Sequence, residues 1–282
     1  MASFSLFPDS PRLSQVFSRR RFRVRWRNND PVLTELIIVV CVVVWILEML
    51  FRFTWRTGYA ALLDFGMFQP ATALWHPWTF VTSMFLHSPS SLWHILFNML
   101  TLWAIGPFLE RLMGHWPYLI LYVLSGIGGN VGMMAWAAFG SSAGSGSGTV
   151  ASVLGLTGTE WYSACYGASG ALFGLFAAML VVYRKVGEDL RSALVWMIIN
   201  FLMPVVIPNI AWQAHVFGFL VGGILTMLLI YGPIRALRIR PLLLRSVIYG
   251  IVMLLILVVI VVLCNTVNPL LALSSVITIP SA

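Results

Sequence analysis

Long runs of apolar residues recur along this chain, separated by short polar or glycine-rich stretches. Seven of them reach or approach the roughly 20 residues that cross a bilayer as an α-helix. They cover about 33–53, 92–112, 116–139, 162–183, 192–208, 212–232 and 246–265. The fifth run is the most interrupted, because it contains Asn200, Pro204 and Pro208. The pattern predicts an all-α polytopic membrane protein.

The same pattern divides the chain into four parts. A basic arm over residues 1–32 precedes a membrane core of six helices over 33–232. An additional transmembrane helix is predicted over 246–265, followed by a short tail over 266–282. The connection over 54–91 is rich in aromatic residues, so we expect it to lie partly in the membrane interface.

Composition and charge then give the environment and the orientation. The chain is 60% hydrophobic and 9% charged, with a mean hydropathy of +0.91, which excludes an ordinary soluble domain. Of the 17 basic residues, only Arg52 and Arg56 fall on one side of the predicted topology. The positive-inside rule therefore predicts a cytoplasmic N-terminus and an outer C-terminus. We expect the membrane to be the plasma (inner) membrane. The net charge of +8 indicates contact with anionic lipid and not with nucleic acid.

Two polar residues stand at similar depth in two of the runs. Ser169 lies in the sequence Gly167-Ala168-Ser169-Gly170, about seven residues into the fourth run, and His215 lies near the outer end of the sixth. At about 1.5 Å per residue, Ser169 should lie roughly 10 Å below the outer surface. Alone, such a serine commonly bonds to its own helix, and a histidine can be structural. Together they are typical of a nucleophile and its base, with Phe173 within reach of the imidazole.

Glycines predict that the two runs are neighbours. Gly170 and Gly174 are four residues apart on one run, and Gly218 and Gly222 are four apart on the other. Small residues at this spacing let helix backbones approach closely in lipid. Because Gly218 and Gly222 follow His215 by three and seven residues, the histidine should face the contact.

A second polar pair precedes these runs. His94 and Asn98 lie one helical turn apart near the outer end of the second run. Both side chains can donate hydrogen bonds, as the oxyanion of an acyl-transfer reaction requires, although they could instead tie this helix to a neighbour. None of the nine acidic residues lies near His215 in sequence, which indicates a Ser–His dyad without a third member. A His-Glu-x-x-His motif is absent and the three cysteines lack ligand spacing, so no metal or cofactor is predicted.

Over residues 75–227, the chain resembles the rhomboid family of intramembrane serine proteases. The resemblance rests on His94-x-x-x-Asn98, Gly167-x-Ser169-Gly170 and Ala214-His215-x-x-Gly218-x-x-x-Gly222. It implies a six-helix core, with Ser169 as nucleophile, His215 as general base and acid, and His94, Asn98 and the Ser169 N–H at the oxyanion. Glu110 with Gly114 is similar to the family's Glu-x-x-x-Gly, whose carboxylate holds an outer loop or a helix end.

Three departures from the family pattern accompany the match. Thr79 stands where many members have arginine, and a seventh span follows the core. The gap between His87 and His94 is two residues longer than usual, because Ser88-Pro89-Ser90-Ser91 expands the turn. The resemblance implies single-span transmembrane substrates with small and helix-destabilising residues near the cut.

Two other functions remain open. A proteolytically inactive rhomboid-like adaptor would bind membrane clients without cleaving them, although such relatives generally lack the serine or the histidine. A small-solute transporter would use Ser169 and His215 as polar lining, but it should show inverted repeats, and the sequence shows none.

Overall fold

The computed structural model describes residues 19–140, 159–189 and 211–271, together with positions 191, 194, 195, 197–199 and 201. In these residues, six helices are long and apolar enough to cross a membrane. They are α3 (Val32–Thr54), α6 (Leu92–Met113), α7 (His115–Ala135), α9 (Ser169–Val186), α11 (Trp212–Tyr231) and α13 (Leu242–Asn265). The all-α polytopic fold is thereby confirmed. The predicted run over 192–208 lies largely outside the described residues.

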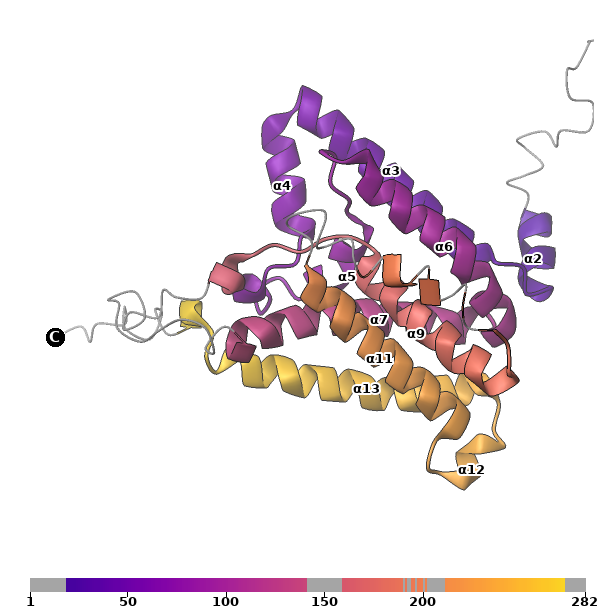
Figure 1. Ribbon diagram of the computed structural model, residues 1–282. Helices are drawn as coiled ribbons and strands as arrows, with labels where there is room; N and C mark the ends of the chain where they lie inside the picture. Colours follow the sequence, from indigo (N-terminus) through magenta and orange to yellow (C-terminus); the bar gives the residue numbers. More distant parts are fainter. Residues whose placement is uncertain are drawn as a thin grey trace, which may run out of the picture.

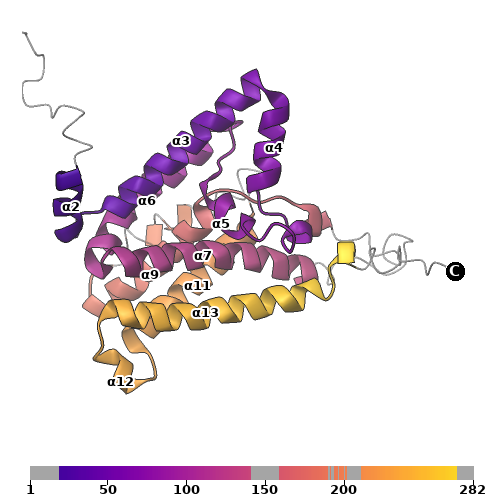
Figure 2. The ribbon, with the colours of Figure 1, turned by 180° about the vertical axis from the view of Figure 1, so that it is seen from behind.

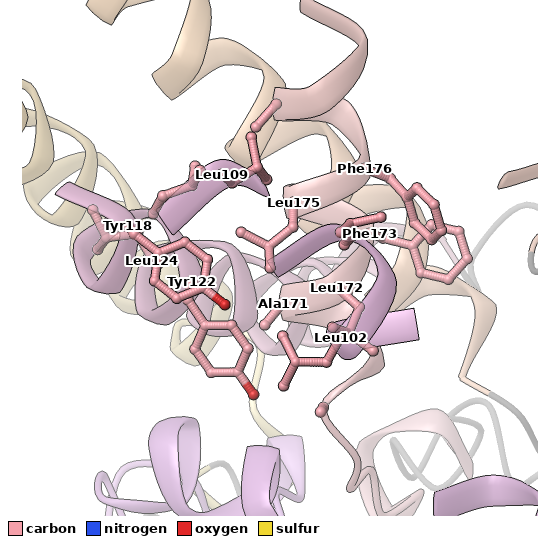
Figure 3. Close-up of a cluster of buried hydrophobic side chains, with 14 of the residues drawn as sticks. Leu102, Leu109, Tyr118, Tyr122, Leu124, Ala171, Leu172, Phe173, Leu175 and Phe176 are labelled. Atoms are coloured by element: carbon pink, nitrogen blue, oxygen red, sulfur yellow. The ribbon is translucent and has the colours of Figure 1, made fainter. Parts of the chain in front are cut away.

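Helices α7, α9 and α11 form the centre of the bundle, as Figures 1 and 2 show from opposite sides. Helix α3 lies beside α6 at one edge, whereas α13 lies along α7 and α11 at the other edge. The short α12 (Arg235–Arg238) connects α11 to α13. Leucine and aromatic side chains from α6, α7 and α9 fill the interior, among them Leu102, Tyr122 and Phe176 (Figure 3).

The apolar run over 162–183 is only partly a helix. Helix α9 begins at Ser169, so the prediction that the fourth span begins near residue 162 is wrong. The preceding residues leave the helical conformation because Cys165 pairs with Phe68 in an isolated antiparallel bridge and Gly167 has a φ of +132°. Ser169 is therefore the first residue of its helix and does not lie seven residues inside one.

The aromatic connection over 54–91 is folded against the core. It contains α4 (Arg56–Gly66), the short helices η1 (Pro70–Thr72) and η2 (Ser83–Phe85), and α5 (Thr79–Thr82). Asn130 of α7 donates hydrogen bonds from its amide to the Phe80 carbonyl and the Ser83 hydroxyl. A central helix thus fixes this connection beside the segment that leads into α9. Its position at the membrane interface stays a prediction.

At the opposite end of the bundle, Glu110 joins three helices. Its carboxylate accepts the main-chain N–H groups of Leu33 and Thr34, both at 2.8 Å, and the Thr34 hydroxyl at 2.7 Å. These donors have no partner inside α3, because the first N–H groups of a helix lack an acceptor. His115 Nδ1 lies 2.6 Å from the same carboxylate, and His115 Nε2 lies 2.9 Å from the Trp26 carbonyl of α2 (Arg19–Arg27). The carboxylate that the resemblance singled out therefore holds a helix end.

Candidate active site

The main chains of α9 and α11 touch at their glycines. A Cβ added at Gly218 would lie 2.1 Å from the Gly170 carbonyl oxygen, and one added at Gly222 would lie 2.4 Å from the Cα of Gly174. Since real Cβ contacts stay beyond 3.0 Å, only glycine fits at either position. Gly174 meets a third helix as well, since its added Cβ would lie 2.1 Å from the Ser125 hydroxyl of α7. This close approach brings the first turns of α9 and α11 together.

Ser169 and His215 meet across this contact. Ser169 Oγ lies 2.9 Å from His215 Nε2, and the imidazole is 5% exposed. The Phe173 ring stacks on the imidazole, with centroids 4.3 Å apart and planes 22° apart. Phe201 packs edge-on against Phe173, at 4.3 Å between centroids. Within the described part of the chain, His215 Nδ1 has no hydrogen-bond partner, so packing orients the ring where a triad would use a carboxylate.

His94 and Asn98 lie against the segment that precedes Ser169. A Cβ added at Gly167 would lie 2.8 Å from His94 Nε2 and 3.9 Å from Asn98 Nδ2. The Ser88 N–H donates to His94 Nδ1 at 3.3 Å, which leaves Nε2 to carry the proton of the neutral ring. His94 therefore directs its Nε2–H toward Gly167, two residues before Ser169. Asn98 uses one amide hydrogen on the His94 carbonyl at 2.9 Å and retains a second.

Main-chain hydrogen bonds fix the segment that leads into α9. Phe68 and Cys165 exchange two bonds, of 3.0 and 2.8 Å, and the Gly167 N–H donates to the Ser83 carbonyl at 2.8 Å. Ser169 then starts the helix, where N–H groups lack helical acceptors and carry the positive end of the helix dipole. Such donors are suited to a negative charge that develops beside the serine hydroxyl.

The nearby thiol does not compete as a nucleophile. Burial raises the pKa of Cys165 to about 12, so the group stays a neutral thiol near pH 7, and only the thiolate is reactive. In the described ranges, no group of three or more histidine, cysteine, aspartate or glutamate residues gathers as a metal site.

Sequence reasoning missed two polar residues next to the site. The imidazole of His87 is fully buried, 5.3 Å from that of His94, and its Nε2 lies 3.5 Å from the Ala168 N–H. Burial lowers the pKa of His87 to about 3, so this ring is neutral. Glu48 of α3 accepts the main-chain N–H of His87. A carboxylate inside an apolar run is the sequence signal that marks Glu48.

Comparisons with known proteins agree on one family. A family model described as "Rhomboid domain" matches residues 74–232, which is more than half of the chain. The rhomboid protease GluP of Bacillus subtilis is 26% identical over 222 residues, covering 75% of this chain and 37% of its own length. RHOMBOID-like protein 5 of Arabidopsis thaliana is 30% identical over 162 residues, covering 55% of this chain and 45% of its own.

A third relative comes from another bacterium. The rhomboid protease AarA of Providencia stuartii is 29% identical over 167 residues, covering 58% of this chain and 55% of its own length. The chain therefore spans less than two thirds of the length of each of these three relatives.

Proposed function

Because the chain belongs to the rhomboid family, we propose that it is an intramembrane serine endopeptidase with a Ser169–His215 dyad. Its substrates are single-span transmembrane proteins, cut near the outer face of the membrane. The observation that carries the proposal is the 2.9 Å contact between Ser169 Oγ and His215 Nε2, in a buried site lined by hydrogen-bond donors.

The first half-reaction follows from that contact. Ser169 Oγ attacks the scissile carbonyl carbon while His215 Nε2 takes the hydroxyl proton. The carbonyl oxygen becomes negatively charged and accepts hydrogen bonds from His94 Nε2–H, the free amide hydrogen of Asn98 and the Ser169 N–H. His215 then gives the proton to the departing amine, the C–N bond breaks, and an acyl-enzyme remains on Ser169.

The second half-reaction reverses these roles with water. His215 Nε2 removes a proton from a water molecule as its oxygen attacks the ester carbonyl. The same donors hold the oxyanion, and the proton returns to Ser169 Oγ when the ester bond breaks. Phe173 keeps the imidazole plane in place through both steps by stacking on it.

The charge distribution supports an outer location for this chemistry. The Arg184 and Lys185 end of α9 is basic, whereas Ser169 begins the opposite end of that helix. Applied to these helices, the positive-inside rule supports a cytoplasmic N-terminus and a dyad toward the outer face. A substrate helix must unwind there before its carbonyl is accessible, because its main chain is otherwise hydrogen-bonded internally.

The deciding experiment compares purified variants on one substrate in detergent and in liposomes. Wild-type protein should cleave a single-span substrate that has small residues near the outer boundary, and Ser169→Ala and His215→Ala should not. Each variant must retain the wild-type unfolding midpoint. Cleavage that persists in Ser169→Ala would refute the nucleophile assignment. Absence of cleavage by wild type, with substrate still co-purifying, would favour the adaptor alternative.

A further inference from the structure

One face of the outermost helix carries three polar side chains that all reach the same turn. Trp45, Glu48 and Arg52 of α3 are spaced by three and four residues, so they share a helix face. Each bonds to residues 87–91: Trp45 Nε1 to the Ser88 carbonyl at 3.4 Å, Glu48 Oε2 to the His87 N–H at 3.0 Å, and an Arg52 guanidinium nitrogen to the Ser90 hydroxyl at 2.7 Å. Every other residue of α3 between Leu36 and Phe53 is apolar, so this part of the helix directs a single polar stripe at one turn.

Glu48 is the most unusual member of the stripe. It is fully buried in a membrane helix, where a carboxyl group is unfavourable unless it has a role. Only one of its oxygens bonds to the turn, and Oε1 has no hydrogen-bond partner among the described residues. The carboxyl group is therefore not held by a complete set of hydrogen bonds. What explains its presence is the acceptor oxygen that it offers to the His87 N–H.

The turn that Glu48 holds contacts the active site twice. His87, whose main-chain N–H Glu48 accepts, places its ring beside both His94 and the Ala168 N–H. The next residue, Ser88, donates its N–H to His94 Nδ1. That bond determines which nitrogen of His94 carries the proton, because an N–H facing Nδ1 excludes a proton there.

We propose that Glu48 is a positioning residue for His94. It holds the 87–91 turn so that the Ser88 N–H faces His94 Nδ1 and Nε2–H faces the oxyanion. The inference rests on the proposed function, because it requires His94 to be an oxyanion donor. It also accounts for the longer gap between His87 and His94, since the stripe on α3 supplies the bonds that hold the extended turn.

The kinetic test uses two substitutions at Glu48. Glu48→Leu keeps the volume and removes the acceptor, so kcat should fall about 10-fold, a part of the 10²–10³ expected when an oxyanion donor is lost. KM should change less than about twofold, since the substrate-binding surface is untouched. Glu48→Gln keeps an acceptor oxygen and should restore kcat to near the wild-type value. The control is Thr34→Val, which removes a buried hydroxyl at the other end of α3. It should lower the unfolding midpoint without lowering kcat.

A spectroscopic measurement reports the tautomer of His94 directly, and its wild-type result does not depend on how the Glu48 variants fold. With ¹⁵N-labelled histidine and His94→Gln to assign the signal, wild-type His94 should show the Nε2–H tautomer. Glu48→Leu should show a mixture. An Nδ1–H tautomer in wild type would overturn the proposal.

A double-mutant comparison separates this inference from the proposed function. Glu48→Leu should cause no further loss of kcat in a His94→Ala background, whereas additive losses would contradict the coupling. If His94→Ala lowers kcat and Glu48→Leu does not, the positioning role alone is wrong. If His94→Ala leaves kcat unchanged, His94 is not an oxyanion donor and the positioning role of Glu48 is refuted as well. The Ser169–His215 dyad is tested separately, by the Ser169→Ala result.

Discussion

The glycine contact between α9 and α11 predicts that a single methyl group can inactivate the proposed Ser169–His215 dyad. In Gly218→Ala, the new Cβ would lie 2.1 Å from the Gly170 carbonyl oxygen and 2.8 Å from its carbonyl carbon. Both obstacles are main-chain atoms, so no side chain can rotate away. The helices must separate by about 1 Å at this turn to restore an ordinary contact, because closely packed interiors do not accommodate overlap.

That displacement acts directly on the proposed catalytic pair. Gly218 follows His215 by one turn on α11, and Gly170 is adjacent to Ser169 on α9. A separation of about 1 Å would lengthen the 2.9 Å contact between Ser169 Oγ and His215 Nε2 beyond hydrogen-bonding distance. We expect kcat to fall about 100-fold, the typical effect of a misplacement of this size. Overpacking should also reduce the free energy of unfolding by about 1–3 kcal/mol.

The neighbouring glycines supply the controls. A Cβ added at Gly223, on the same helix, meets only the Cβ of Ala177 at 3.3 Å, so Gly223→Ala should keep nearly full activity. Gly222→Ala overlaps Gly174 at 2.4 Å but lies two turns from His215, so it should lose stability more than activity. The assay is substrate cleavage per folded molecule, with unfolding midpoints measured in the same detergent. If Gly218→Ala cleaves within threefold of Gly223→Ala, the helix contact does not determine the dyad geometry.

Four further substitutions, one of them a control, test other parts of the structure. Gly167→Ala should lower kcat at least 10-fold in the cleavage assay, because its Cβ would lie 2.8 Å from His94 Nε2. The control is Gly187→Ala, whose added Cβ meets nothing within 4 Å. It should only lower the free energy of unfolding, by about 1–2 kcal/mol. Glu110→Ala should destabilise the fold by about 3–5 kcal/mol in denaturant unfolding, because it leaves buried donors and His115 without their acceptor. Asn268→Ala should cost about 1–3 kcal/mol by the same measurement, since it frees the buried Ala71 carbonyl that the Asn268 amide binds at 3.0 Å; an unchanged midpoint would contradict that role.

Much of the fold was predictable because a bilayer imposes a simple rule. A segment in lipid must satisfy its main chain internally, so apolar length reports a helix directly. That rule located α3, α6, α7, α11 and α13 to within a few residues. It failed at the start of α9, because the residues before Ser169 make main-chain hydrogen bonds outside a helix: Cys165 pairs with Phe68, and the Gly167 N–H donates to the Ser83 carbonyl.

The residues proposed for the site were recognisable individually, because each is a polar group in an apolar run. Helical periodicity also placed Gly218, Gly222 and His215 on one face, and the structure brings that face onto α9. The residues that share one face of a helix follow from the helical period, so the sequence alone can identify them.

The support behind those residues depended on contacts between distant segments. Glu48 and His87 are 39 residues apart, and Leu33 and Glu110 are 77 apart, so no local pattern relates them. The tautomer of His94 is set by a turn held from α3, and the imidazole of His215 is oriented by Phe173, against which Phe201 packs. The sequence by itself determined the membrane helices and the polar residues they carry, because bilayer thickness and helix period act locally. Only the tertiary structure decided which hydrogen bonds and rings hold those residues in place, because these contacts exist only once the helices pack.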